Sequence, residues 1–268
     1  KVGDKWIFNG GIRADHFNMD YDSAVLTTAT SHPALPVGTL VPLDFRFGDT
    51  LVNGKLSALY KPTKDSSVYA LVATSKQPPG TNLVLSGSAN NASNPKFDPQ
   101  DSTTAEIGTK WDFLKQRFPV ASAVYRTSVK NEVGQDPVDL EYYQSGRKQV
   151  QGIELGVTGQ VARNWLVSAG YTRMDTEVES GKVVTASGIN NLSYTPKQAF
   201  TGWTAYTLPN GLKLGGGARF VDKLLRGTDG AIGTPAFADS YWVYDAMASY
   251  AVNKNVELQL NVYNLTDE

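Results

Sequence analysis

The sequence predicts an all-β protein, specifically an antiparallel β-barrel that spans a membrane. Apolar and polar residues alternate with a period of two in many segments, which places the apolar side chains on one face of a strand. Several of these segments have ten residues or more, whereas the usual strand of a globular protein has about five or six. A tilted strand needs roughly 9–11 residues to cross a bilayer.

Short turns and long loops also alternate along the chain. Eleven strands are expected, near residues 5–21, 50–61, 67–75, 103–113, 118–131, 149–161, 164–175, 198–208, 211–221, 240–252 and 255–265. Long loops rich in Gly, Pro, Asn and Ser are expected at 22–49, 76–102, 132–148, 176–197 and 222–239. Outer-membrane barrels place all short turns at one end and all long loops at the other. A compact soluble domain rarely carries five loops of this length.

The alternation assigns the two faces of the strands. In the first strand, Trp6 and Phe8 share the face expected to contact lipid, and Arg13 lies on the other face. A charge on the lipid face costs roughly 2–4 kcal/mol at the midplane, so charged residues are expected toward a wet lumen. We assign three basic residues to the lumen: Arg13, Arg126 and Arg219. Aromatic residues near strand ends fit interfacial girdles: Tyr60, Trp111, Trp165, Tyr206, Trp242 and Tyr250.

The composition excludes several classes of protein. The chain has 25 Lys and Arg against 26 Asp and Glu, so it lacks the basic footprint of a nucleic-acid-binding protein. It has no Cys and two His, which excludes a disulfide framework and leaves no metal site to expect. No apolar run of about 18 residues is present, which excludes a membrane-spanning helix. No nucleophile motif such as Gly-x-Ser-x-Gly and no phosphate loop is found in the sequence.

An odd number of strands indicates part of a larger barrel, because bacterial single-chain barrels have an even number. Large outer-membrane transporters have 22 strands and a plugged lumen. The eleven strands are therefore expected to be strands eleven to twenty-one of such a barrel. On this interpretation residues 1–268 are part of one barrel domain, and an N-terminal plug and the last strand are not present in the chain.

Several segments resemble one family of membrane proteins. Residues 261–267, Asn-Val-Tyr-Asn-Leu-Thr-Asp, are similar to a signature of TonB-dependent outer-membrane receptors, with Thr266 in place of the common Phe. Two further segments resemble the same family: 194–206 and 211–219. Three segments are similar to the ferric catecholate siderophore receptors that take monomeric catechols: 75–80, 106–111 and 227–237.

This resemblance implies a receptor in the outer membrane of a Gram-negative bacterium that binds a ferric catecholate siderophore and imports it actively. In the family, an N-terminal plug rearranges when the inner-membrane TonB complex pulls on it. The implied partners are the siderophore, the TonB complex and the lipopolysaccharide of the outer membrane. No cofactor is implied, because the iron arrives already chelated as the transported ligand.

Ferric catecholates are anionic and aromatic, so their site is expected to combine Arg or Lys with Tyr or Trp. The candidate ligand-binding residues are Tyr142, Tyr143, Arg147, Lys148 and Gln77. The first four belong to one expected loop, 141–148, and Gln77 lies at the root of another. Two alternatives stay open: the segment 141–148 is an ordinary solvated loop, or the basic lumen residues pair with carboxylates of the plug instead of guiding the ligand.

Two other functions also remain open. The first is a passive porin, or a TonB-dependent importer of another bulky solute such as cobalamin, haem or a glycan. The second is a soluble all-β surface protein, such as an adhesin or a propeller. A plug encoded upstream would exclude the passive porin, and solubility without detergent would favour the soluble protein. Mean hydropathy does not decide between them, because a polar lumen and polar loops offset a lipid-facing surface.

Overall fold

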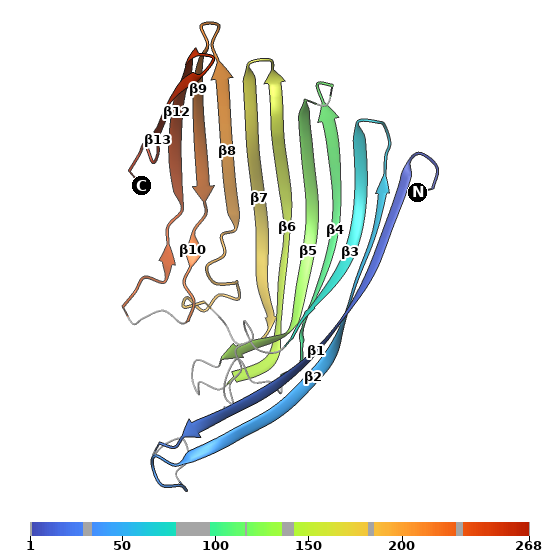
Figure 1. Ribbon diagram of the computed structural model, residues 1–268, viewed down its shortest axis with the longest axis vertical. Coiled ribbons are helices and arrows are strands. Elements are labelled where there is room, and N and C mark those ends of the chain that lie inside the picture. Colours follow the sequence, from blue (N-terminus) through green and yellow to red (C-terminus); the bar gives the residue numbers. More distant parts are fainter. Residues whose placement is uncertain are drawn as a thin grey trace.

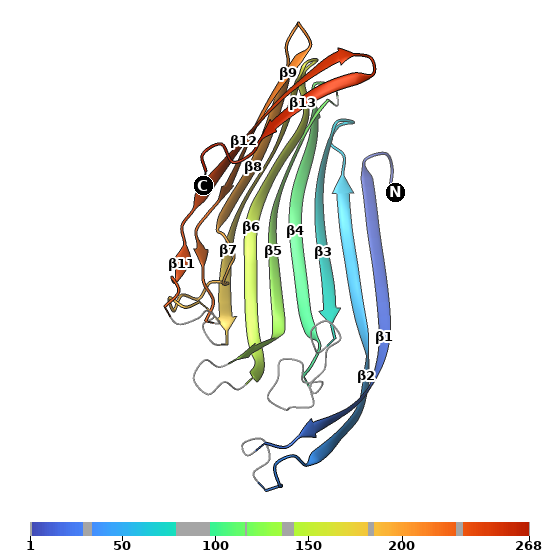
Figure 2. The same cartoon turned by 60° about the vertical axis from the view of Figure 1, so that its left-hand side comes forward.

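The computed structural model shows an open sheet of eleven strands that curves into part of a barrel wall (Figures 1 and 2). It describes residues 2–28, 34–78, 97–115, 117–135, 142–181, 185–228 and 233–267. Sheet neighbours follow each other along the chain and pair antiparallel, so the sheet is a simple up-and-down meander. The prediction of an all-β fold with eleven strands is confirmed.

The strands of this sheet are β1 (Trp6–Leu26), β2 (Leu40–Tyr60), β3 (Ser66–Gln77), β4 (Gln100–Phe113), β5 (Phe118–Gln135), β6 (Tyr142–Ala162), β7 (Trp165–Ser180), β8 (Gln198–Thr207), β9 (Leu212–Val221), β12 (Tyr241–Asn253) and β13 (Val256–Val262). A small separate sheet is formed by β10 (Leu224–Leu225) and β11 (Phe237–Ala238). The described residues include no helix long and apolar enough to cross a membrane.

The two ends of the sheet differ as the sequence predicts. Short turns follow β2, β4, β6, β8 and β12 at the upper end in Figure 1, and the strand ends that the longer connections join lie at the lower end. In the turn from β8 to β9, the amide of Leu208 donates to the carbonyl of Leu212 at 2.8 Å, and Gly211 has a φ of +87°. Glycine adopts this conformation without strain, so it allows the chain to reverse within a few residues.

Four connections are shorter than predicted, because strands continue into segments expected to be loops. β1 and β2 pair without interruption as far as Leu26 and Leu40, inside the expected loop 22–49. β3 and β4 extend by a few residues into 76–102, β5 and β6 extend into 132–148, and β7 continues to Ser180. The sequence interpretation was wrong here because it relied on composition. Beyond a membrane both faces of a strand meet water, so the backbone ladder can continue through polar residues.

The large apolar side chains lie mainly on the outer face of the sheet rather than in a core. Ile12 is 85% exposed, Leu56 67% and Leu260 65%. Among the described residues, the only buried hydrophobic side chains are Leu51, Val178 and Ala205. A soluble sandwich would bury such residues between two sheets. A membrane barrel instead presents them to lipid, so this distribution argues against the soluble alternative.

The apolar band on the outer face has sharp limits. Toward the loops, outward positions change from apolar to polar within one alternation: Val72 to Thr74, Val124 to Arg126, Tyr171 to Arg173 and Phe220 to Asp222. On several neighbouring strands the last apolar outward residues pair with each other, so the band ends at the same level on both strands. These pairs are Val72 with Ala105, Val124 with Ile153, and Phe200 with Phe220. Toward the turns, Trp6 pairs with Tyr60 and Trp165 with Tyr206. These aromatic pairs mark the opposite edge of the band, where a girdle was predicted.

Candidate functional site

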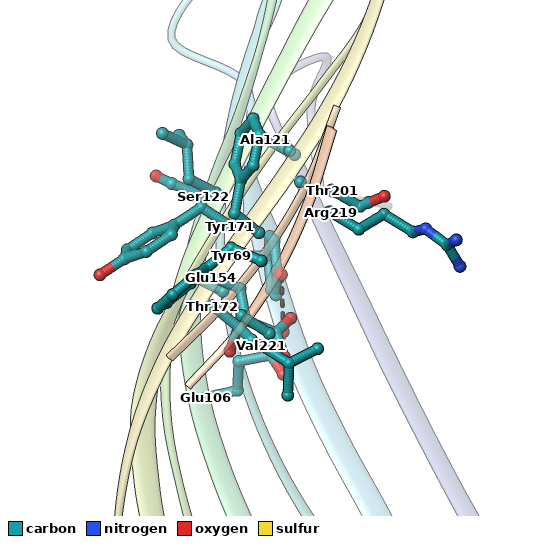
Figure 3. A pocket seen from close by; sticks show the side chains of 17 residues that line it. Tyr69, Glu106, Ala121, Ser122, Glu154, Tyr171, Thr172, Thr201, Arg219 and Val221 are labelled. Atoms are coloured by element: carbon teal, nitrogen blue, oxygen red, sulfur yellow. Dashed lines mark hydrogen bonds between the residues drawn. The ribbon is translucent and has the colours of Figure 1, made fainter. Parts of the chain in front are cut away.

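The inner face of the sheet carries a hollow of about 580 Å³ near the middle of the wall. Polar side chains from several strands line it, among them Tyr69, Glu106, Glu154, Thr172 and Arg219 (Figure 3). The hydroxyl of Tyr69 donates a hydrogen bond to Oε1 of Glu106 at 2.6 Å. These residues alternate along their strands with the lipid-facing apolar positions, so the hollow belongs to the side that faces the lumen.

Two carboxylates are the main charged groups of this hollow. Glu106 on β4 pairs with Tyr125 on β5. Glu154 on β6 pairs with Ala123, which is also on β5, so both glutamate side chains point to the lumen. Neither carboxylate forms an ion pair within the part of the chain that the structure describes. Arg219 lines the same hollow but extends away from both of them in Figure 3. A basic group that enters the lumen would therefore find two acceptors on this wall.

Glycines allow aromatic rings to lie flat against the inner wall. A Cβ atom at Gly108 would lie 2.5 Å from the ring of Tyr69, and one at Gly217 would lie 2.5 Å from the ring of Trp203. Real Cβ atoms do not approach so closely, so any larger residue would push the ring into the lumen. Gly216 lies on the outer face, and its nearest such contact is 3.9 Å away. Of the three glycines at 215–217, only Gly215 and Gly217 face inward and leave room for the ring of Trp203.

Two of the three predicted basic lumen residues lie on the inner face. Arg13 contacts Asp15 at 2.7 Å, two positions along the same strand. Arg219 lies 3.9 Å from Asp245, whose Oδ1 accepts a hydrogen bond of 3.0 Å from the amide of Asn264. Each guanidinium therefore has a carboxylate on its own wall, which reduces the charge that it presents to the lumen.

Arg126 does not face the lumen, and the prediction that it does is wrong. It pairs with Ala105 and Gln151 on the outer face, bonds the side chain of Gln149 and lies 3.8 Å from Glu179. The preceding residues of β5 are small or apolar on both faces, so alternation alone did not distinguish the faces. Arg126 is tolerated because it lies just beyond the apolar band, where a charge costs little.

The residues predicted to bind ligand do not form one loop. Tyr142, Tyr143, Arg147 and Lys148 all belong to β6, which corrects the expected loop at 141–148. Arg147 lies 3.8 Å from Glu179, whereas Lys148 forms an ion pair with Glu132, so the two basic groups point to opposite faces. The ring of Tyr143 lies against Gly134 and Gly181. Gln77 ends β3, where it pairs with Gln100.

Sequence reasoning missed the two inner carboxylates. Glu106 and Glu154 were not assigned a role, although each is the only acidic residue in a run of small and apolar neighbours. An isolated charge at a lumen-facing position is the signal that could have found them.

His16 forms a hydrogen bond of 2.9 Å with Thr50 Oγ1. The described residues contain no group of three or more His, Asp or Glu side chains that could hold a metal ion.

Comparison with known proteins identifies the family. Residues 1–265 match the family described as TonB dependent receptor-like, beta-barrel. The chain belongs to this family. This confirms two predictions from the sequence: the fold of a TonB-dependent receptor barrel, and a location in the outer membrane of a Gram-negative bacterium.

Individual receptors of this family are closely similar to the chain. The catecholate siderophore receptor Fiu of Escherichia coli (strain K12) is 42% identical over 97% of this chain and 35% of its own length. The probable TonB-dependent siderophore receptor PiuA of Acinetobacter baumannii is 35% identical over 100% of this chain and 35% of its own length. The chain therefore spans about a third of these relatives.

Solved structures give the same assignment. The ferric-catecholate import receptor Fiu from E. coli K12 superimposes in its closed form with a TM-score of 0.88 and 40% identity, covering 100% of this chain and 39% of that chain. Its open form gives a TM-score of 0.74 and 34% identity, covering 100% of this chain and 35% of that chain. Of these two structures, the closed form superimposes better on this chain.

Proposed function

We propose that the chain is part of an outer-membrane receptor that binds ferric catecholate siderophores and imports them with energy delivered by TonB. The observation that carries this proposal is the 42% identity to a catecholate siderophore receptor over 97% of the chain. The ferric siderophore is the transported ligand rather than a cofactor, and no bond of it is made or broken. The protein is accordingly a transporter and not an enzyme.

Active transport requires an element that closes the lumen at rest. We assign this role to a plug domain of the parent protein, as the resemblance to the family implies. Glu106 and Glu154 are suited to hold it, because neither carboxylate has an ion-pair partner among the described residues, and a basic group of the plug could form a charge-assisted hydrogen bond with each. Arg13 already lies 2.7 Å from the carboxylate of Asp15, and Arg219 lies 3.9 Å from that of Asp245. We therefore favour the two glutamates over the arginines as contacts for the plug.

The outward arginines beyond the apolar band are assigned to lipopolysaccharide. Arg126 and Arg173 each follow the last apolar outward residue of their strand. Planar guanidinium groups bind phosphate in a bidentate manner, and lipopolysaccharide carries phosphates at this level of the membrane. Purified parent protein with Arg126→Ala and Arg173→Ala should retain less lipopolysaccharide phosphate than the unchanged protein. The lumen variant Arg219→Ala should retain the normal amount, and equal retention by all three proteins would exclude the assignment.

A binding titration tests the proposed ligand. The full-length parent protein in detergent is titrated with a ferric catecholate and, separately, with a ferric hydroxamate, and tryptophan fluorescence reports binding. Saturable quenching by the catecholate alone supports the proposal. Quenching by neither complex would exclude siderophore transport and would indicate another bulky solute, such as cobalamin, haem or a glycan. Conductance through the parent protein without any ligand would instead indicate a passive porin.

A further inference from the structure

Positive charge is concentrated at one end of the sheet. We call this end the turn end, because the short turns lie there, at the top of Figure 1. Seven Lys or Arg and two Asp occur among its described residues outside the strands, which are 2–5, 61–65, 114–115, 117, 163–164, 208–211 and 254–255. The whole chain is balanced, with 25 Lys and Arg against 26 Asp and Glu. The excess of basic residues at the turn end is therefore a local feature.

Two of these seven residues belong to the lumen side. Lys61 and Lys64 line a second hollow of the inner face, of about 640 Å³. The other five are all exposed, and we call them the basic rim: Lys5, Lys115, Arg117, Arg163 and Lys254. None of the five forms an ion pair within the part of the chain that the structure describes. The rim therefore presents charges that no described carboxylate neutralises.

The basic rim begins where the aromatic girdle ends. Lys5 directly precedes Trp6, and Arg163 lies two residues before Trp165. Because one strand residue spans about 3.3 Å, these two charges start within about 7 Å of the girdle. The headgroup layer on each side of the hydrocarbon core is about 5–8 Å thick. Long Lys and Arg side chains extend along apolar surface to reach such a layer, so the rim lies at the level of the lipid headgroups.

The leaflet at this level is the periplasmic one, because outer-membrane barrels place their short turns in the periplasm. Anionic phospholipids such as phosphatidylglycerol present phosphate groups there. Arg binds phosphate in a bidentate manner, and Lys binds it as a point charge. Each basic residue near an anionic lipid surface strengthens binding about fivefold.

The distribution of the rim favours lipid over an acidic protein as its partner. Lys5 adjoins β1, whereas Lys254 lies between β12 and β13, at the opposite edge of the sheet. The remaining rim residues lie in the turns between these edges. A layer of lipid around the wall contacts all of these turns at once, whereas a protein partner usually covers one contiguous patch.

We propose that the basic rim binds the phosphate groups of anionic phospholipids in the periplasmic leaflet of the outer membrane. This inference goes beyond the proposed function, because it concerns the membrane around the barrel and does not depend on the imported solute. The rim differs from the outward arginines assigned to lipopolysaccharide, which lie at the other end of the apolar band. The two ends of the wall thus recognise the two different leaflets.

The test is a competition between two lipids for the full-length parent protein in detergent. Phosphatidylglycerol and phosphatidylethanolamine with the same acyl chains are supplied in equal amounts, and native mass spectrometry counts the bound molecules of each. The unchanged protein should bind several times more phosphatidylglycerol. The triple variant Lys115→Gln, Arg163→Gln, Lys254→Gln should reduce this preference at least about fivefold.

A matched control removes the same number of positive charges from the loop end. The triple variant Lys76→Gln, Lys130→Gln, Lys223→Gln should keep the preference within about twofold, because salt screens charges that lie farther apart than about 10 Å. Equal binding of the two lipids by the unchanged protein would overturn the proposal. An undiminished preference in the turn-end variant would also overturn it. An equal loss in both variants would show that net charge, and not the rim, attracts the lipid.

Discussion

A charge placed at the centre of the apolar band should destabilise the protein far more than the same charge one residue away. Leu56 is the middle one of the five outward positions of β2 between Tyr60 and Val52, and it is 67% exposed. In a membrane this surface contacts lipid, so Leu56→Arg transfers a guanidinium into hydrocarbon. We expect a loss of roughly 2–4 kcal/mol in the free energy of unfolding, the cost of a basic residue at the midplane.

The neighbouring position provides the control. Ser57 faces the lumen, where its hydroxyl lies 3.5 Å from the side-chain amide of Asn9. Ser57→Arg introduces the same side chain into a wet environment and should cost less than about 1 kcal/mol. Urea unfolding of the parent protein in lipid vesicles measures both values. An exposed leucine of a soluble protein can be replaced by arginine with almost no loss in the free energy of unfolding. Equal effects of the two substitutions would therefore mean that Leu56 does not contact lipid, and would refute the assignment of faces.

Two further experiments test the inner wall. Gly217→Ala should destabilise the parent protein by about 1–3 kcal/mol in the same unfolding assay, because its Cβ would meet the ring of Trp203. The control Gly216→Ala should change the free energy of unfolding by less than about 0.5 kcal/mol. Equal effects of the two substitutions would contradict the packing of the ring against Gly217. Glu106→Gln combined with Glu154→Gln should weaken retention of the plug, by about 1.5–3 kcal/mol for each lost charge-assisted bond. Cells expressing this double variant should become more sensitive to a large hydrophilic antibiotic, and unchanged sensitivity would mean that the glutamates do not hold the plug.

The sequence predicted the number and order of the strands because two independent regularities agreed. Alternation gave the strands within the membrane, and the short turns fixed their ends to within a few residues. The loop-side ends could not be predicted in the same way. Leu26 and Leu40 pair deep inside the expected loop 22–49, where the two strands continue beyond the apolar band. Hydrogen bonds of the backbone determine such extensions, and composition does not report them.

The candidate site was predicted less well than the fold. Arg126 was placed on the wrong face because β5 has small or apolar residues at both alternating positions before it. Tyr142 to Lys148 suggested a cluster through nearness in sequence, but in a strand adjacent side chains point apart. Glu106 and Glu154 are 48 positions apart in the chain, and only the pairing of both strands with β5 brings them to one wall.

The most direct test of the central claim is iron uptake by cells in which the parent protein is the sole siderophore receptor. Radioactive iron is supplied as a ferric catecholate, in cells with and without a functional TonB complex. The account predicts saturable uptake that is lost without TonB, and no uptake of a ferric hydroxamate. Uptake that continues at the same rate without TonB would contradict active import and would identify the protein as a passive pore.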